Sequence, residues 1–272
     1  MLIGQISDLH ILANRGIAHG VGDTSVYLEA LEEHLAALTP ALDGLVITGD
    51  LADKGEREAY VFIKNVFSSW KIPIWIVPGN HDLRVNLVQE LGAYCPAIKA
   101  LLPFLCYSVD MGPIQLIMLD SVVEGEHHGG IDQQVADWLE ARLEGTKDKL
   151  VMVFAHHPPF LSFMGDMDLP FENADRLIKI LSRNPQVLFA CGHLHCGLTT
   201  FFQGVRAVVA PPVSLHMDLE LTATGGNQFN LGAPAFVLHH FEKGLLNSHF
   251  GLLSGNWPFS GPHKFLEMDM IR

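Results

Sequence analysis

The sequence predicts an α/β fold, because short apolar segments typical of strands alternate with segments of helical periodicity along the first two-thirds of the chain. A second observation is that Asp, Asn and His follow directly after several of the predicted strands. After residue 197 the helical periodicity ends, and β-type segments separated by Gly and Pro take over. We therefore predict a core over 1–197 and a β-rich part over 198–272 that completes the second sheet.

The predicted elements follow in chain order. Strands are expected at 2–7, 44–49, 73–77, 104–109, 114–119, 150–155 and 187–191. Helices are expected at 24–38, 56–70, 83–94, 132–144 and 172–183, the first capped by Asp23 or Thr24. Further strands are expected at 198–203, 205–210, 235–241 and 245–250. The Gly-rich stretch 216–234 is expected to be a long loop.

Composition limits the classes of protein that fit. The 272 residues are 49% hydrophobic, enough for a sizeable core, yet no apolar stretch reaches the ~18 residues of a membrane span. No secretory signal pattern opens the chain, so we expect a cytoplasmic protein. The net charge of -13 argues against a nucleic-acid polymer as partner. Four cysteines without a CxxC pair predict reduced, mostly buried thiols.

The first group of polar residues follows the opening strand. Asp8 and His10 stand in the segment ISDLH at its end. Residues i and i+2 of an extended chain point to the same side, so the carboxylate and the imidazole are expected to reach one metal ion together. Such a triplet is also common by chance, so its meaning depends on the groups that follow.

Two further groups follow the next two predicted strands. Asp50 lies in TGDLADKG, and Asn80, His81 and Asp82 lie in PGNHDLR. Functional groups of open α/β sheets gather beyond the carboxyl ends of the strands. The two oxygens of Asp50 can bridge two ions, and the Asn80 carboxamide oxygen is a neutral ligand. Each group taken alone is also typical of a helix cap or a turn.

Histidines complete the series. His156 in AHHPP ends strand 150–155, and His193 and His195 in CGHLH follow strand 187–191. Imidazole is a common ligand for zinc, iron, cobalt and manganese. Five predicted strands thus end in Asp, Asn or His, which core packing of the chain's fifteen histidines does not explain. The sequence predicts a metal centre at this edge of the sheets.

The ordered series DxH, GD, GNHD, a strand-end His and GHxH resembles that of the calcineurin-like metallophosphoesterases over residues 8–195, with every element present. The segments GDLADKGEREAY, PGNHDLR, AHHPPF and CGHLH are most similar to the bacterial class III cyclic-nucleotide phosphodiesterases and the related glycerophosphodiesterase. The resemblance implies a four-layer α/β/β/α sandwich with two mixed β-sheets and a small β-rich C-terminal extension. It also implies a homo-oligomer formed through the C-terminal part.

The resemblance further implies a dinuclear centre. One ion would be held by Asp8, His10, Asp50 and His195, and the other by Asp50, Asn80, His156 and His193. This mixture of ligands suits two divalent or trivalent ions among Fe, Mn, Zn and Co. The expected activity is hydrolysis of small phosphodiesters, either 3′,5′-cyclic nucleotides or glycerophosphodiesters, by attack of a metal-bound hydroxide on phosphorus.

Two histidines are expected to contact the substrate together with Asn80. His81 is expected to contact the phosphate and to help protonate the leaving alkoxide, with orientation of a ligand as the alternative. His216 follows the PPVS segment, where similar phosphodiesterases bring a loop near the substrate. This sequence lacks the Ser-Thr pair common there, which leaves the substrate open.

Three other histidines are expected to have lesser roles. His157 is expected to be structural or to orient a ligand, because consecutive strand residues point to opposite faces. His127 and His128, in EGEHHGG, are expected in a solvated loop, with pocket lining as the alternative.

Alternative functions remain open at this stage. A phosphomonoesterase fits the same motifs, whereas the acidic balance disfavours a nuclease. A non-catalytic scaffold of the same superfamily is disfavoured because every ligand position is filled. Loops 11–23, 121–131 and 213–234 are expected to form the pocket walls that decide the substrate.

Overall fold

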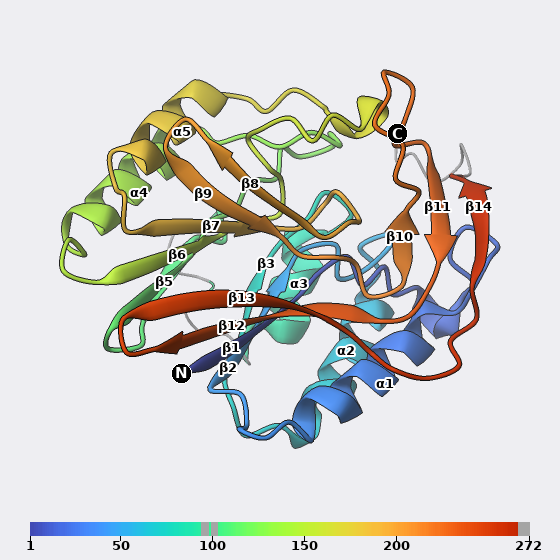
Figure 1. Ribbon diagram of the computed structural model, residues 1–272. Coiled ribbons are helices and arrows are strands. Elements are labelled where there is room, and N and C mark those ends of the chain that lie inside the picture. The colour runs from blue at the N-terminus through green and yellow to red at the C-terminus, as the bar shows by residue number, and fades with distance from the viewer. Residues whose placement is uncertain (94–97, 99–102, 266–272) are drawn as a thin grey trace.

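The computed structural model describes residues 1–93, 98 and 103–265, which three β-sheets organise (Figure 1). The first sheet has five strands in the order β13-β12-β1-β2-β3. Its strands are β1 (Leu2–Ile6), β2 (Gly44–Thr48), β3 (Ile74–Val77), β12 (Ala235–Glu242) and β13 (Leu245–Leu252). The first three are parallel to one another, and β12 and β13 join them as an antiparallel pair.

The second sheet has six strands in the order β4-β5-β6-β7-β9-β8. They are β4 (Tyr107–Asp110), β5 (Ile114–Met118), β6 (Leu150–Phe154), β7 (Val187–Cys191), β8 (Leu198–Phe202) and β9 (Val205–Val209). The inner strands β5, β6, β7 and β9 are parallel, and β4 and β8 are antiparallel edges. A smaller sheet contains β10 (Leu215–Met217), β11 (Gln228–Leu231) and β14 (Ser260–Lys264).

Helices cover the outer faces of the two large sheets. They are α1 (Thr24–Ala36), α2 (Arg57–Val66), α3 (Arg84–Leu91), α4 (Gln133–Glu144) and α5 (Ala174–Ser182), with short 3-10 turns at Ala13–Arg15, Phe67–Ser69 and Gly165–Met167. The expected cap at Asp23 is confirmed, since its carboxylate accepts from the Ser25 N–H at 3.0 Å. None of the helices among the described residues is long and apolar enough to cross a bilayer.

Residue alternation along the second sheet explains how the layers pack. On β5 and β6, Ile117, Val151 and Val153 pack in the same apolar cluster as α4 and α5. Their neighbours Leu116 and Met152 belong instead to the cluster that contains the first sheet. Figure 1 shows α4 and α5 outside one sheet and α1 and α2 outside the other. The expected α/β class with two mixed sheets is confirmed.

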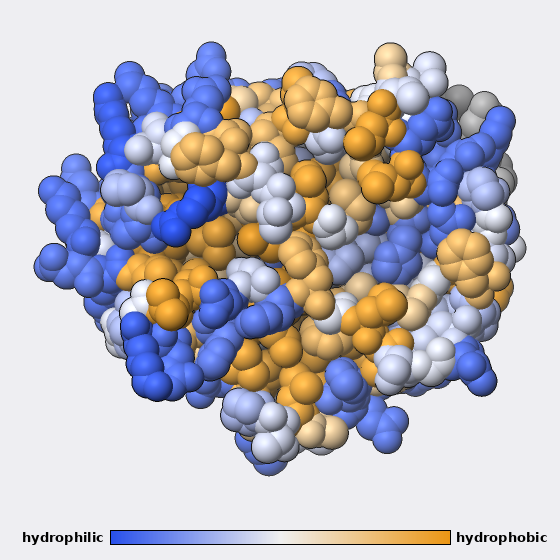
Figure 2. All heavy atoms as spheres, in the orientation of Figure 1, coloured by the Kyte–Doolittle hydropathy of each residue, from blue (hydrophilic) through white to orange (hydrophobic). Residues whose placement is uncertain are grey.

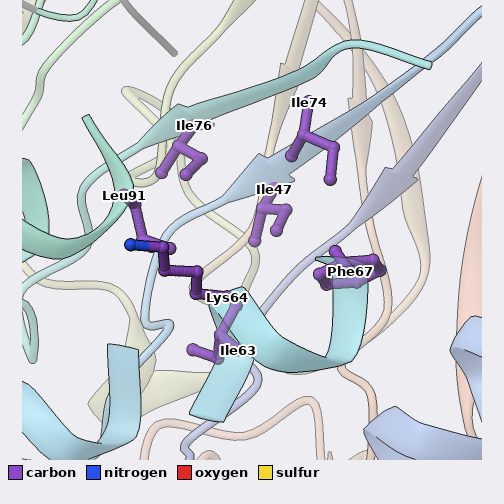
Figure 3. Close-up of a pocket in the computed structure, with 7 residues that line it drawn as sticks. All are labelled: Ile47, Ile63, Lys64, Phe67, Ile74, Ile76 and Leu91. Atoms are coloured by element: carbon purple, nitrogen blue, oxygen red, sulfur yellow. The ribbon is translucent and has the colours of Figure 1, made fainter. Parts of the chain in front are cut away.

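The contact between α2 and the first sheet is closely packed (Figure 3). Ile47 of β2 and Ile74 and Ile76 of β3 face the helix. On the other side of the contact are Ile63 of α2 and Phe67, which directly follows α2. The void left between them is about 10 Å³, and its lining residues are apolar except for Lys64. A space of that size holds at most one water, so this void belongs to the core and is no ligand site.

The stretch 216–234 differs from its prediction, because a loop over its whole length is wrong. It contains β11, which pairs with both β10 and β14. Phe229 and Leu231 are buried and alternate with half-buried Gln228 and Asn230, which is the period-two pattern of a strand. Thr222, Thr224, Gly225 and Gly226 lie before the strand, and Gly232 follows it.

The cysteine prediction is confirmed where the structure describes the chain. Cys106 and Cys191 are buried free thiols, and Cys196 is a half-buried one. Cys95 lies outside the described residues, as does the expected end of helix 83–94; the described helix ends at Leu91.

Candidate metal centre

All seven predicted ligands lie where the carboxyl ends of β1, β2, β3, β6 and β7 meet between the two large sheets. Six of them are buried and Asn80 is half-buried. Parallel strands bring their carboxyl ends to one edge, which explains why residues far apart in sequence come together here. The backbone N–H of His193 donates to the carboxylate of Asp8 at 3.2 Å across 185 positions of sequence.

The first group of candidate ligand atoms belongs to Asp8, His10, Asp50 and His195, which lie within 4.8 Å of one another. The Nε2 atom of His10 is 3.7 Å from Oδ2 of Asp50 and 3.1 Å from Nε2 of His195. The Nε2 atom of His195 is 3.5 Å from Oδ1 of Asp8. These four side chains therefore surround one point with two nitrogens and two carboxylates.

Hydrogen bonds on the far side of the rings decide which nitrogen faces that point. The His10 Nδ1–H donates to Oδ1 of Asp53 at 2.9 Å, and the His195 Nδ1–H donates to the Leu215 carbonyl at 2.5 Å. The Nε2 atoms of the two rings then face each other. Two nitrogens 3.1 Å apart repel each other unless a proton or a metal ion lies between them. The donor set thus fits a metal ion.

The second group surrounds His156. Its Nδ1–H donates to the Thr48 carbonyl at 2.7 Å, which directs Nε2 toward Oδ2 of Asp50 and Oδ1 of Asn80, each 3.2 Å away. His193 completes the group, and its ring centroid is 5.2 Å from that of His156. Because the same Asp50 oxygen faces both His10 and His156, its carboxylate lies between the two groups.

His157 also points into the centre, for a reason that strand alternation does not capture. The strand ends at Phe154, so His156 and His157 lie in a turn, and their ring centroids are 4.7 Å apart. The Nε2 atom of His157 is 3.1 Å from Oδ1 of Asn80. The expectation that the two rings face opposite sides is therefore wrong.

Electrostatics divide the histidines into two kinds. Burial alone would lower the pKa of His10, but the Asp53 hydrogen bond and the carboxylates of Asp50 and Asp8 raise the pKa to about 9. Burial is likewise outweighed at His156, where Asp50 raises the pKa to about 9. In contrast, burial lowers the pKa of His195 to about 4. A metal ion therefore has to displace protons from the first two rings.

The backbone at the centre is strained. Five of the seven predicted ligands have positive φ, between 46° and 68°: Asp8, His10, Asp50, His193 and His195. This left-handed conformation is uncommon for residues with a Cβ and costs ~1–3 kcal/mol each. It corrects the expectation of an extended chain at Asp8 and His10, and explains how the side chains turn toward one point.

His81 lies on the open side of the centre. Its backbone N–H donates to Oδ1 of Asp50 at 2.9 Å, and its Nδ1–H donates to the Asp53 carbonyl at 2.7 Å. The ring meets that of His10 edge to face, at 4.8 Å between centroids. These contacts leave Nε2 as the ring atom that can reach a substrate.

Three residues that the prediction gave no role support the centre. Asp53 holds His10 by its carboxylate and His81 by its carbonyl oxygen. The buried Asp82 carboxylate accepts from the N–H groups of Leu51 and Ala52, which joins the two motif loops. Ser121 contacts His157. Asp53 and Asp82 stand inside GDLADKG and GNHD, so their motifs pointed to them, whereas nothing local marks Ser121.

The structure places the remaining predicted residues at different distances from the centre. The His216 ring donates from Nε2 to the Ala233 carbonyl at 2.8 Å. His127 reaches the centre, with Nδ1 3.4 Å from Nδ2 of Asn80, so the pocket-lining alternative is correct for it. His128 pairs with Glu172 at 3.0 Å.

A cavity of about 580 Å³ lies beside the centre. Of the three loops expected to form pocket walls, 121–131 lines this cavity, while no described lining residue comes from 11–23 or 213–234. The first turns of α3 and residues Pro103 and Leu105 form the other walls.

Two relatives match most of the chain. The chain is 32% identical over 266 residues to a probable glycerophosphodiester phosphodiesterase GpdQ of Arcobacter nitrofigilis, covering 95% of this chain and 97% of that protein. It is 29% identical over 244 residues to the 3′,5′-cyclic adenosine monophosphate phosphodiesterase CpdA of Escherichia coli K12, covering 84% of each.

Among solved structures, GAP50, the anchor in the inner membrane complex of Plasmodium, matches with a TM-score of 0.62 over 97% of this chain and 88% of that one. At 14% identity this is a likeness of fold alone. The family model described as calcineurin-like phosphoesterase matches residues 1–197, which include all seven predicted ligands. The chain belongs to the calcineurin-like phosphoesterase family.

Proposed function

We propose that this protein is a metal-dependent phosphodiesterase that hydrolyses small diesters, either 3′,5′-cyclic nucleotides or glycerophosphodiesters. The observation that carries the proposal is the pair of ligand groups that share Asp50, at an edge where strained backbone turns five side chains inward. The similarity to glycerophosphodiester and cyclic-nucleotide phosphodiesterases supports the substrate class.

We assign the ligands as two sets with Asp50 as the bridge. The first is Asp8, His10, Asp50 and His195, and the second is Asp50, Asn80, His156 and His193. Nitrogen and oxygen donors in this ratio suit Fe, Mn, Zn or Co, and ion availability decides among them as much as affinity does. When bound, the ions would supply a polarised water and neutralise negative charge on the phosphoryl oxygens.

Within this scheme the protein's own side chains position the reactants. His81, held at Nδ1 by the Asp53 carbonyl, directs Nε2 toward the substrate side, where it contacts a phosphoryl oxygen and donates a proton to the leaving alkoxide. The Asn80 carboxamide lies between His156 and His127 and contributes to both metal and substrate contacts. Asp50 accepts the His81 N–H, which ties the catalytic ring to the bridging ligand.

His216 is proposed as a further substrate contact. Its ring donates from Nε2 to the Ala233 carbonyl, so a substrate would have to reach another atom of the ring or replace this hydrogen bond. Replacing His216 by Ala should raise KM for a diester with little effect on metal content. Unchanged KM for both candidate substrate classes would remove His216 from the site.

The test of the proposed function is hydrolysis by protein reconstituted with Mn²⁺, Co²⁺, Zn²⁺ or Fe²⁺. The substrates are 3′,5′-cAMP, glycerophosphoethanolamine, bis(p-nitrophenyl) phosphate and p-nitrophenyl phosphate, with Asp50→Ala as the inactive control. Turnover of diesters that disappears in the control supports the proposal and ranks the substrates. Faster hydrolysis of the monoester indicates a phosphomonoesterase, and bound metal without any turnover indicates a scaffold.

We also propose that the C-terminal part mediates self-association. The strand β13 is an edge of the first sheet, has eight residues without a charged side chain, and exposes Leu245 and Leu252. Figure 2 shows apolar residues over the middle of the face that carries β8, β9 and β13. Antiparallel pairing of β13 with the same strand of a second copy would cover this edge. Light scattering should then show a dimer that Leu252→Lys dissociates.

A cytoplasmic location is proposed from the thiols. Cys106, Cys191 and Cys196 are free, which a reducing compartment maintains. Recovery of the protein with the cytoplasmic fraction of its cells would support this location, and recovery from a periplasmic extract would contradict it.

A further inference from the structure

The 580 Å³ cavity beside the proposed centre is continuous with it, because Asn80, His81 and His127 line one end. Its other walls come from the start of α3, from the loop after β5, and from Pro103 and Leu105. A group bonded to a phosphorus held near His81 would therefore extend into this space. Its volume suits a substituent the size of an aromatic ring or larger.

The walls of the cavity are apolar and in part exposed. Val85 is 72% exposed and Leu83 49% exposed, although both lie at the start of a helix whose later residues Leu87 and Leu91 are buried. Val122 extends the apolar wall from the opposite loop. Exposed apolar side chains that converge beside a polar centre are typical of a ligand-binding surface.

The charges around the cavity disfavour an anionic occupant. The Arg84 guanidinium is engaged by the buried Asp120 carboxylate through bonds of 2.7 and 2.9 Å. At the rim, Glu124 and Glu126, with side chains 92% and 57% exposed, add two negative charges against the one positive charge of Lys54. A phosphate or carboxylate in this space would meet net repulsion, whereas an uncharged group would meet none.

We propose that this cavity is a subsite for an uncharged, apolar ester substituent, so that, beyond the two proposed substrate classes, the protein also favours diesters with an aryl or bulky alkyl group on one side of phosphorus. This rests on the proposed phosphodiesterase function and adds a specificity that the ligand residues alone do not provide. Val85 is the selecting side chain, because it is the most exposed apolar residue of the wall at the start of α3.

The test compares benzyl and methyl esters of p-nitrophenyl phosphate, which share a leaving group and differ in the second substituent. The wild type should prefer the benzyl ester by about tenfold or more in kcat/KM, as burial of an aromatic ring predicts. The variant Val85→Glu should lose most of that preference, measured as the ratio of kcat/KM for the two esters. The matched control Val26→Glu, at a 45% exposed position on α1 outside the cavity, should keep the preference.

A binding measurement separates this proposal from the proposed function. Calorimetry with benzyl and methyl methylphosphonate reports the subsite without turnover. Tighter binding of the benzyl compound that Val85→Glu abolishes supports the subsite even if neither diester is hydrolysed, in which case only the phosphodiesterase proposal falls. Equal binding of the two compounds by the wild type overturns the subsite. The same preference for the benzyl compound in Val85→Glu and Val26→Glu also overturns it.

Discussion

Ser121 and His157 hold each other through two hydrogen bonds. The His157 backbone N–H donates to the Ser121 Oγ at 3.1 Å, and that oxygen lies 2.9 Å from Nδ1 of the His157 ring. The hydroxyl has one proton, and donation to Nδ1 satisfies both buried groups, so the neutral ring carries its proton on Nε2. That proton points at Oδ1 of Asn80, 3.1 Å away. The His157 ring therefore donates a hydrogen bond to the Asn80 carboxamide oxygen and orients it. A protonated Nε2 has no lone pair that could compete with that oxygen.

Replacing Ser121 by Ala should weaken the binding of one metal ion by about 10- to 100-fold, because the His157 ring then no longer has a defined tautomer facing Asn80. Calorimetric titration of the metal-free protein with a metal ion measures the change in affinity. Ser214→Ala is the matched control, since Ser214 is equally buried and its hydroxyl has no hydrogen-bond partner among the described residues. Equal loss of affinity in both variants would contradict the orienting role.

Replacing His81 by Ala should lower kcat by about 10²- to 10⁴-fold while metal content stays near that of the wild type, because a proton donor is lost and no ligand is. Elemental analysis and steady-state kinetics on the same preparations measure both quantities. The decrease should be smaller for a substrate with p-nitrophenolate as leaving group, which needs no proton. Loss of metal together with activity would mean that His81 acts on the ligands instead.

The stability of the protein should fall as the pH is lowered because of His239, which is not among the predicted ligands. His239 on β12 is buried, and burial lowers its pKa to about 3. The unfolded chain takes up a proton below about pH 6.5 while the folded chain does not, so the contribution of His239 is complete above pH 6.5 and is lost as pH falls toward 3.

Between pH 7 and pH 5 this loss should amount to ~2 kcal/mol of unfolding free energy. Urea denaturation of the wild type and His239→Gln at both pH values measures it, because the variant lacks the titrating ring and all other histidines are shared. A pH dependence that is the same in both proteins would show that His239 does not contribute.

Removing the Arg84 side chain should destabilise the fold strongly. Asp120 is fully buried and accepts from Arg84, from the Leu105 N–H and from the Val122 N–H. Arg84→Leu leaves that carboxylate without its cation, which costs about 3–5 kcal/mol. Denaturant unfolding checks the value. Arg15→Leu, which removes the exposed pair with Glu29, should change stability far less.

The strand ends that carry the ligands could be predicted from the sequence, because each depends on a local pattern. A short apolar run ends, and a residue with metal-ligating chemistry follows within a few positions. Asp50 after β2 and Asn80 after β3 are both of this kind. The missed strand β11 shows the limit of this reasoning, since its four residues pair with segments on either side that a local pattern does not include.

The orientation of the side chains was decided by tertiary contacts. Asp8 and His10 were expected on an extended chain, yet both adopt positive φ. Their backbone N–H groups donate to the carbonyls of Gly49 and Asp50 on the neighbouring segment, which helps to stabilise that strained conformation. Because these hydrogen bonds join segments some forty residues apart, the residue pattern within either segment does not reveal them.

By itself the sequence determined the fold class, the residues that meet at the carboxyl ends of the strands, and the family to which their order belongs. Tertiary structure alone decided that Ser121 sets the tautomer of His157, that His127 reaches Asn80, and that Val85 faces a cavity beside the centre. The physical reason is range: strand formation and motif order depend on neighbours along the chain, whereas a hydrogen bond or a cavity wall depends on segments that only packing of the two sheets brings into contact.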